Sequence, residues 1–234
     1  MVAPNKNIED QGMSESRLIF FPDVSLHTKS KPNPRMMMFL DTATTYTGYA
    51  LIERSEIDPS LAQVAGYGLF KAPKGPVGIR TKVIASKISN IIHTVKPGML
   101  VQEYPTIQGG QKGTAASRSG GVLHLSYLCG KIDSCWDFYL AMIVSDNQGN
   151  PAIKKILNAF RYAVNLTYRE WNGQSPKKAT CRRCEEFLGV DEGSIDPASI
   201  DNNWADALMM GVWYCHKKLF IKVIPNSEAE RVDM

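Results

Sequence analysis

The chain has 234 residues, 44% of them hydrophobic, and a formal net charge of +4 at pH 7. These values suit one globular domain with extensions, and no stretch reaches the roughly 18 uninterrupted apolar residues of a membrane span. The N-terminus lacks the basic start and apolar core of a signal peptide, and the five cysteines have no disulfide-framework spacing. We therefore expect a cytoplasmic protein that is not secreted.

Basic residues are unevenly distributed along the chain. Between Pro59 and Ile132 the only acidic residue is Glu103, against nine Lys or Arg. Such a block often lines a surface that binds a polyanion such as nucleic acid. The alternative is a solvated face that only keeps the protein soluble, and charge alone leaves both readings open.

Hydrophobic periodicity divides the chain into a partly flexible N-terminal extension (1–35), one domain (36–224) and a C-terminal tail (225–234). For residues 144–168 the pattern is ambiguous, and we favour a short helix followed by a strand. The predicted elements are strands at 36–41, 46–54, 62–71 and 99–105, a helix at 77–95, a helical stretch at 115–143, a strand near 163–168, and helices at 177–188 and 202–218. This order predicts a mixed α/β sheet.

Three acidic residues occupy positions where a carboxylate needs a partner. Asp41 and Glu103 each follow an apolar run near the end of a predicted strand, at the sheet edge where open α/β folds place their sites. Asp206 shares one face of the 202–218 helix with apolar residues at i+3, i+4 and i+7. A carboxylate on such a face is costly unless a cation or a hydrogen bond compensates it.

A divalent metal would convert the repulsion among three carboxylates into attraction. Hard oxygen ligands suit Mg²⁺ or Mn²⁺, and two such ions about 4 Å apart can activate a water and stabilise the leaving oxygen of a phosphodiester. The alternative is that the three acids are unrelated polar termini.

Several segments resemble a known family. The segments "FLDTATTYTGYALIE", "LVQEYP" and "NNWADALMMGVWY" resemble the active-site segments of RuvC-like Holliday junction resolvases, within the ribonuclease H-like superfamily, and "REWNGQSPKK" resembles a segment of their phage versions. The resemblance covers roughly Met36 to Phe220. It implies a ribonuclease H-like fold with a five-stranded sheet flanked by helices, a two-metal site and a homodimer. It also implies a structure-selective endonuclease that leaves 5′-phosphate and 3′-hydroxyl ends.

The resemblance assigns roles to individual residues. Asp41, Glu103 and Asp206 match the family's metal-binding acids. Asn203 stands where the family often has a fourth acid or a histidine, and Asp201 is the nearest carboxylate. We expect Asn203 to bind the second metal weakly through its amide oxygen and Asp201 to cap the helix, but either residue remains a candidate fourth ligand.

Basic residues complete the predicted site. Lys177 and Lys178 fall where family members carry a basic residue near the scissile phosphate, although a solvated pair that opens a helix is an equal alternative. The glycine-rich loop before Arg118 contains Lys112, and such a loop can follow a phosphate backbone closely. The predicted DNA-binding residues are Lys112, Arg118, Lys178, Arg80 and Lys82.

The sequence thus predicts a Mg²⁺- or Mn²⁺-dependent endonuclease that acts on four-way junctions, with DNA and a second copy of the chain as partners and with neither a membrane nor a small-molecule cofactor. Three alternatives remain. The first is another ribonuclease H-like nuclease acting on flaps, branched DNA or RNA–DNA hybrids, and the second is a non-catalytic junction-binding protein, which Asn203 keeps open. The third is a sugar kinase or ATPase of the actin-like fold, which would need a glycine-rich second phosphate motif and a second domain, and the chain is too short for both. Cys181 and Cys184 have no second cysteine pair with which to complete a zinc site, so we interpret them as ordinary helix residues.

Overall fold

The computed structural model describes residues 32–105, 121–146, 151, 163–173, 175–200, 202–225, 231 and 233–234. Within these ranges a six-stranded sheet has the order β5-β4-β1-β2-β3-β6. The strands are β1 (Asn33–Asp41), β2 (Tyr46–Arg54), β3 (Leu61–Lys71), β4 (Pro97–Glu103), β5 (Val164–Leu166) and β6 (Lys222–Ile224). The helices are α1 (Val77–Val95), α3 (Gly121–Asp146), α5 (Tyr168–Asn172), α6 (Lys177–Leu188) and α7 (Asn202–Lys218).

The strand directions define the fold class. Strands β1, β2 and β3 form an antiparallel meander, β4 runs parallel to β1, and β5 runs parallel to β4. This is the predicted ribonuclease H-like arrangement of a mixed sheet. The predicted count of five strands is wrong by one, because β6 adds a parallel edge strand beside β3. Three residues are too few to show the alternation from which a strand is predicted.

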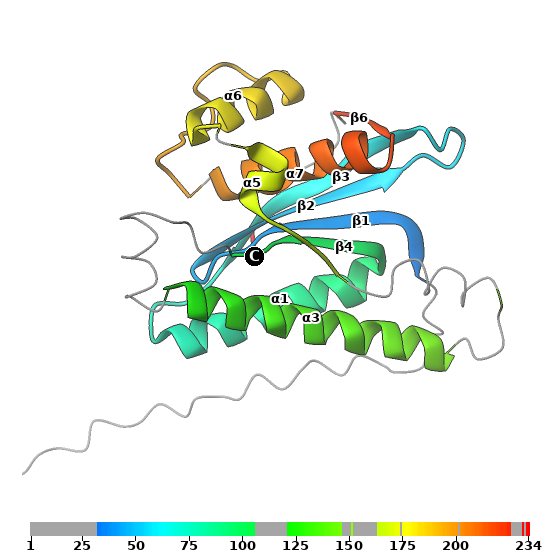
Figure 1. The fold of residues 1–234 in the computed structure, drawn as a ribbon, viewed down its shortest axis with the longest axis vertical. Helices are drawn as coiled ribbons and strands as arrows, with labels where there is room; N and C mark the ends of the chain where they lie inside the picture. The colour runs from blue at the N-terminus through cyan, green and yellow to red at the C-terminus, as the bar shows by residue number, and fades with distance from the viewer. Residues whose placement is uncertain are drawn as a thin grey trace, which may run out of the picture.

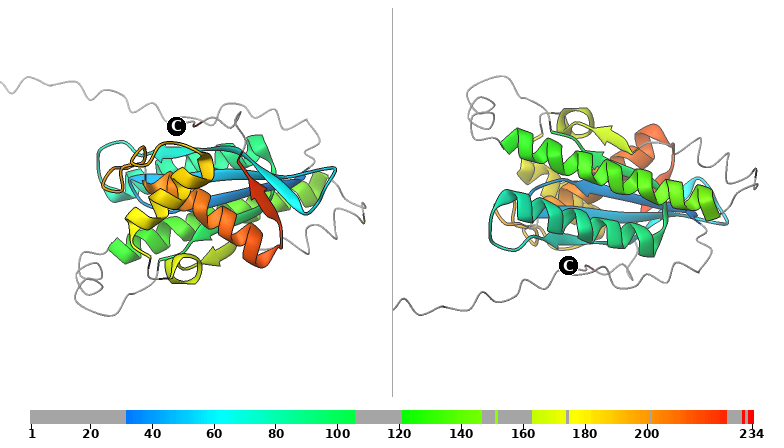
Figure 2. Two further views of the ribbon diagram at one scale, coloured as in Figure 1. Left: turned by 90° about the horizontal axis from the view of Figure 1, so that it is seen from above. Right: turned by 90° about the horizontal axis from the view of Figure 1, so that it is seen from below.

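Helices cover both faces of the sheet (Figures 1 and 2). Helix α7 lies on one face with α5 and α6 on the same side, and α1 and α3 cover the other. Alternation along β1 divides the core between the two layers, since Met38 and Leu40 pack toward α1 and α3 while Met37 and Phe39 pack toward α7.

Most of the predicted elements match the structure. The elements at 46–54, 77–95, 177–188 and 202–218 have the predicted bounds. The predicted helical stretch 115–143 is helical from Gly121 to Asp146, and its first six residues lie outside the described part of the chain, as does the short helix favoured after residue 151. Helix α5 was not predicted, because one short turn of helix leaves no readable period.

Both ends of the described chain are attached to the sheet. Strand β1 begins at Asn33, inside the range predicted as an extension. At the other end, the backbone of Met234 exchanges hydrogen bonds with Leu69 and Lys71 of β3, and Lys71 Nζ lies 2.7 Å from Asp233 Oδ2. None of the described helices combines the length and hydropathy needed to cross a membrane.

Candidate active site

Strand alternation directs Asp41 and Glu103 to the same face of the sheet. Asp41 continues the series of Met37 and Phe39, and Glu103 continues the series of Met99 and Val101 on β4; all four apolar residues pack in the α7 layer. The two strands are parallel, and the paired residues Leu40 and Gln102 directly precede the two acids. The acids therefore end neighbouring strands at one edge of the sheet, on the side of α7.

Helix α7 brings Asp206 to this edge because its first turn packs tightly on β2. A Cβ atom at Gly48 would lie only 2.0 Å from the carbonyl oxygen of Asn203, so only glycine permits this approach. The Asn203 amide Nδ2 donates a 2.6 Å hydrogen bond to the carbonyl of Tyr46. Asp206 lies on the next turn of α7 and is 2% exposed.

Asn203 thus fastens α7 to the β1–β2 hairpin through its amide nitrogen. Its expected role as a metal ligand through the amide oxygen stays a prediction. Asp201 lies outside the described residues, so its expected role as a helix cap also stays a prediction.

Burial perturbs all three carboxylates, and repulsion by neighbouring carboxylates adds to the pKa shifts of Asp41 and Glu103. Burial, followed by the charges of Glu103 and Asp206, raises the pKa of Asp41 well above its ordinary value. Burial raises the pKa of Glu103 to about 7, although a hydrogen bond from Trp171 opposes the shift. Burial also raises the pKa of Asp206 against the opposing charge of Lys177. These shifts all have the sign that a nearby cation would reverse.

Lys177, the first residue of α6, supplies a positive charge inside this group. Its Nζ lies 3.0 Å from Asp206 Oδ2 and 2.9 Å from Asn202 Oδ1. Burial alone would lower the pKa of Lys177, but the charges of Asp206 and Asp41 outweigh it and raise the pKa. Lys177 is half exposed but contacts Asp206, so it is part of the candidate site. Lys178 is also exposed on α6.

Trp171 is a site residue that the sequence analysis missed. Its indole Nε1–H donates a 2.9 Å hydrogen bond to Glu103 Oε2, and the side chain is 5% exposed. The available signal was a tryptophan in the otherwise polar segment "REWNGQSPKK". The sequence could not identify its acceptor, which lies 68 residues earlier in the chain.

The donor types at this edge fit a divalent cation. Three carboxylates offer hard oxygen ligands, and Asp206 Oδ1 is buried without a hydrogen-bond partner in the described structure. As the side chains stand, no three His, Cys, Asp or Glu residues of the described ranges lie close enough to hold one ion. Glu103 and Asp206 each direct one oxygen to a protein donor, Trp171 and Lys177 respectively. The residues thus fit a metal in charge and donor type, without forming a closed cage.

The predicted DNA-binding residues fall into three groups. Arg80 is partly buried and its Nη1 donates a 2.8 Å hydrogen bond to Thr45 Oγ1, which joins α1 to the turn that follows Asp41. Lys82 and Lys178 are exposed, on α1 and α6 respectively. Lys112 and Arg118 lie outside the described residues.

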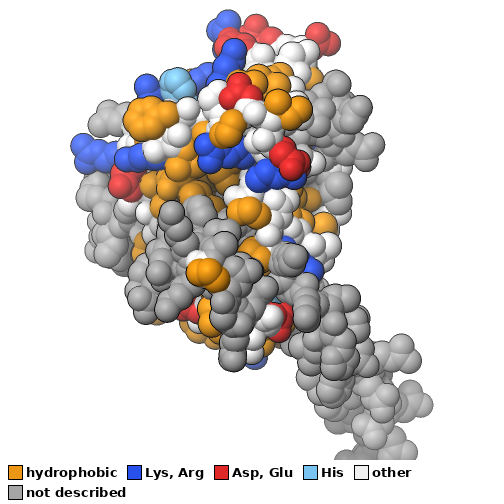
Figure 3. All heavy atoms as spheres, turned by 90° about the vertical axis from the view of Figure 1, so that its right-hand side faces the viewer, with side chains coloured by type: hydrophobic (Ala, Val, Ile, Leu, Met, Phe, Trp, Pro, Cys, Tyr) orange, Lys and Arg blue, Asp and Glu red, His pale blue; other side chains and the backbone are white. Residues whose placement is uncertain are grey.

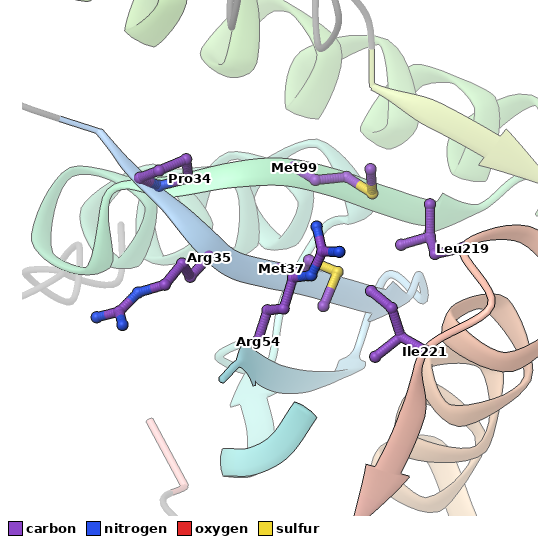
Figure 4. Close-up of a pocket in the computed structure, with 7 residues that line it drawn as sticks. All are labelled: Pro34, Arg35, Met37, Arg54, Met99, Leu219 and Ile221. Carbon is purple, nitrogen blue, oxygen red and sulfur yellow. The ribbon is translucent and has the colours of Figure 1, made fainter. Parts of the chain in front are cut away.

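A separate pocket lies at the opposite end of β1, away from the carboxylates. Figure 4 shows its lining by Pro34, Arg35, Met37, Arg54, Met99, Leu219 and Ile221. This end of the molecule presents hydrophobic side chains interspersed with Lys and Arg (Figure 3). The pocket contains no carboxylate, and it takes no part in the candidate active site.

Comparisons with known proteins give weak structural matches. No protein-family model matches the sequence, and no curated protein matches it significantly. The structure is similar to Thermus thermophilus RuvC, with 13% identity, a TM-score of 0.43 and coverage of 77% of this chain and 95% of that one. RuvC of the same organism in complex with a Holliday junction substrate has 13% identity and a TM-score of 0.42, and the match covers 78% of this chain and 96% of that one. The yeast mitochondrial Holliday junction resolvase Ydc2 has 10% identity and a TM-score of 0.30, and the match covers 81% of this chain and 86% of that one. Likenesses of this size carry no argument about function, which therefore depends on the site itself.

Proposed function

We propose that this protein is a metal-dependent, structure-selective endonuclease that resolves four-way (Holliday) DNA junctions by phosphodiester hydrolysis. One observation carries the proposal: Asp41, Glu103 and Asp206 come from three separate elements to one edge of a ribonuclease H-like sheet, with the ammonium group of Lys177 among them. Gathering carboxylates with raised pKa values costs stability, which is typical of a functional site, and a bound cation would offset their repulsion.

In this proposal Asp41, Glu103 and Asp206 hold Mg²⁺ or Mn²⁺, with two ions in the complete site. A pair of such ions supplies an activated water and a counter-charge for the leaving oxygen. Lys177 has a different role, because its ammonium group can transfer its hydrogen bonds from Asp206 to a phosphate oxygen when DNA arrives. A lysine acts here as a point charge that neutralises a phosphate.

The proposal includes a homodimer, because a four-way junction offers two-fold symmetry that an isologous dimer matches. Helix α3 supports it, since its buried residues face the sheet while Leu123, Tyr127 and Phe138 are at least half exposed. At about 100° per residue these three side chains lie within roughly 60° of one another, on the side of the helix opposite its buried face. Such a second apolar face is typical of an interface.

The test is cleavage of labelled four-way junction, flap and RNA–DNA hybrid substrates, compared side by side with and without Mg²⁺. We expect the junction to be cut by paired nicks on opposing strands, only with the metal present. Preferential cutting of the flap or the hybrid would identify a different ribonuclease H-like nuclease.

A non-catalytic junction-binding protein is the second candidate, favoured by two observations. Lys177 already neutralises Asp206, and the carboxylates form no closed metal cage in the described structure. This candidate predicts tight junction binding and no cleavage with Mg²⁺ or Mn²⁺. Metal titration of the DNA-free protein, followed by calorimetry, separates the two candidates, because only the nuclease requires a site for the ion.

A further inference from the structure

We propose that Trp171 is a positioning residue that fixes the Glu103 carboxylate for metal binding, through the hydrogen bond from its indole N–H to Glu103 Oε2. This inference rests on the proposed function, because it concerns the same acidic site. The segment that carries Trp171 was noted in the sequence, but no role was assigned to the tryptophan.

The contact satisfies a buried donor and a partly buried acceptor at once. The indole of Trp171 is 5% exposed, and a buried indole N–H needs an acceptor. Glu103 needs a donor, because a carboxylate withdrawn from water is costly without one. The 2.9 Å separation between Nε1 and Oε2 is that of a well-formed N–H···O hydrogen bond, which is charge-assisted when Glu103 is ionised.

The chain between Glu103 and Trp171 holds this contact in place. Glu103 of β4 pairs directly with Leu166 of β5, and the N–H of Tyr104 donates a 2.6 Å hydrogen bond to the Leu166 carbonyl. Helix α5 begins immediately afterwards at the N-cap Thr167, whose side chain accepts from the N–H of Glu170. The strand pairing therefore fixes the start of the helix, and the helix fixes the indole.

A second set of contacts joins α5 to α6. The buried amide of Asn172 donates to Thr180 Oγ1 at 3.0 Å and also contacts Tyr168 and Arg183. This network holds Trp171 and Lys177 within one connected unit, so that the first contacts Glu103 and the second contacts Asp206. One segment of the chain thus orients two of the three carboxylates.

We expect loss of the Trp171 hydrogen bond to weaken the binding of the metal ion more than the binding of DNA. The indole engages Oε2, which restricts the rotation of the carboxylate and leaves Oε1 for a cation. Without this donor Glu103 can adopt other rotamers, so the free energy of ordering it must be supplied when the ion binds. We therefore expect Trp171→Phe to weaken Mn²⁺ binding about tenfold, which corresponds to about 1.4 kcal/mol.

The contact itself is tested by NMR on the metal-free full chain. The protein has four tryptophans, and therefore four indole N–H signals, of which Trp171→Phe identifies one. We expect Glu103→Gln to move that signal because a neutral amide oxygen is a weaker acceptor than a carboxylate. An unmoved signal in Glu103→Gln overturns the proposal, whether or not the protein is a nuclease.

The role is tested by calorimetric titration of Mn²⁺ and by the affinity for a junction. Trp213→Phe is the matched control, because it removes a partly buried tryptophan two turns along α7 from Asp206. We expect Trp171→Phe alone to lose Mn²⁺ affinity, with junction affinity unchanged in both variants. Equal or tighter Mn²⁺ binding by Trp171→Phe overturns the positioning role. Absence of Mn²⁺ binding by the wild type would instead overturn the proposed function, while the Glu103→Gln signal still reports on the contact.

Discussion

At the scale of single residues, the acids of the site are unfavourable for folding. Asp41 is 9% exposed and its pKa is raised by burial and by two neighbouring carboxylates. Of the three acids of the site, Asp206 alone forms an ion pair with a lysine in the described structure, and its Oδ1 is still without a hydrogen bond. Residues that reduce stability in this way are typical of functional sites.

We predict that Asp41→Asn, Glu103→Gln and Asp206→Asn each abolish cleavage and leave junction binding largely intact, because the acids serve chemistry while the basic surface serves affinity. Gel-shift and cleavage assays on the same junction measure the two effects separately. Asp191→Asn is the control, since Asp191 is exposed in the loop after α6. Full activity in any of the three variants would remove that residue from the site.

The stability of the metal-free protein should depend on pH through Glu103. Burial raises its folded pKa from 4.5 to about 7, so between these values the folded state keeps a proton that the unfolded chain has released. Glu103 therefore makes its full contribution to the free energy of unfolding below about pH 4.5, and this contribution is lost as the pH rises to about 7. Urea unfolding in EDTA across this range should show the free energy of unfolding declining as the pH rises. In Glu103→Gln this dependence on pH should be less steep. A slope that does not change in Glu103→Gln would contradict the assignment.

We predict that Asn203→Asp destabilises the protein by about 1–3 kcal/mol, because a carboxylate has no N–H for the Tyr46 carbonyl that now accepts from Nδ2. Thermal unfolding measures the loss, with the exposed Asn90→Asp on α1 as the control. The expectation that Asn203 is a weak metal ligand is tested by a different measurement. It predicts that Asn203→Asp requires less Mg²⁺ than the wild type for half-maximal cleavage. An unchanged melting temperature would show that the hydrogen bond to Tyr46 does not hold α7 in place.

At the scale of elements, the site depends on how α7 meets the β1–β2 hairpin. Asp41 ends β1, Gly48 lies on β2 beneath the first turn of α7, and Asp206 follows on the next turn. Any displacement of this turn from the sheet therefore changes the separation of the two acids.

Gly48→Ala should accordingly abolish cleavage and destabilise the protein, because its Cβ would lie 2.0 Å from the Asn203 carbonyl oxygen and 2.6 Å from the Trp204 nitrogen. Backbone atoms cannot move aside as a flexible side chain can. Gly78→Ala is the matched control, since a Cβ there meets nothing within 4 Å and a helical glycine costs about 0.5–1 kcal/mol relative to alanine. Activity and melting temperature both near wild type in Gly48→Ala would contradict the close packing.

At the scale of the whole molecule, α3 has two apolar faces. Trp136, Tyr139 and Ile143 are buried against the body of the protein, while Leu123 and Phe138 are 70% and 62% exposed. The exposed apolar side chains of the outer face are available for contact with a second copy of the chain, as the proposed dimer needs.

We predict that Leu123→Glu converts a homodimer into a monomer and abolishes paired nicking, because a charge at a packed interface is costly to bury. Sedimentation measures the oligomeric state, free and on junction DNA. Ile57→Glu is the control, since Ile57 is 97% exposed at the turn between β2 and β3. A wild-type monomer at micromolar concentration, both free and on the junction, would count against the dimer.

Local pattern was sufficient to predict much of this protein from its sequence. Hydrophobic periodicity and turn residues predicted β2, α1, α6 and α7 at their observed bounds. The acids that end β1 and β4 were recognised because each closes an apolar run. Helix α5 and strand β6 were missed because so few residues show no clear period. Strand β5 is as short as β6, but it lies within the strand predicted near 163–168.

The relation between distant residues was decided only by the tertiary structure. Strands β1 and β4 are apolar toward both layers, so the sequence could not show which face Asp41 and Glu103 share; the position of α7 decides it. Trp171 became a site residue because β5 pairs with β4 and places α5 beside Glu103. Lys177 was distinguished from Lys178 by its contact with Asp206. A local pattern specifies which groups a segment buries, whereas the partner of each buried polar group depends on how the segments pack.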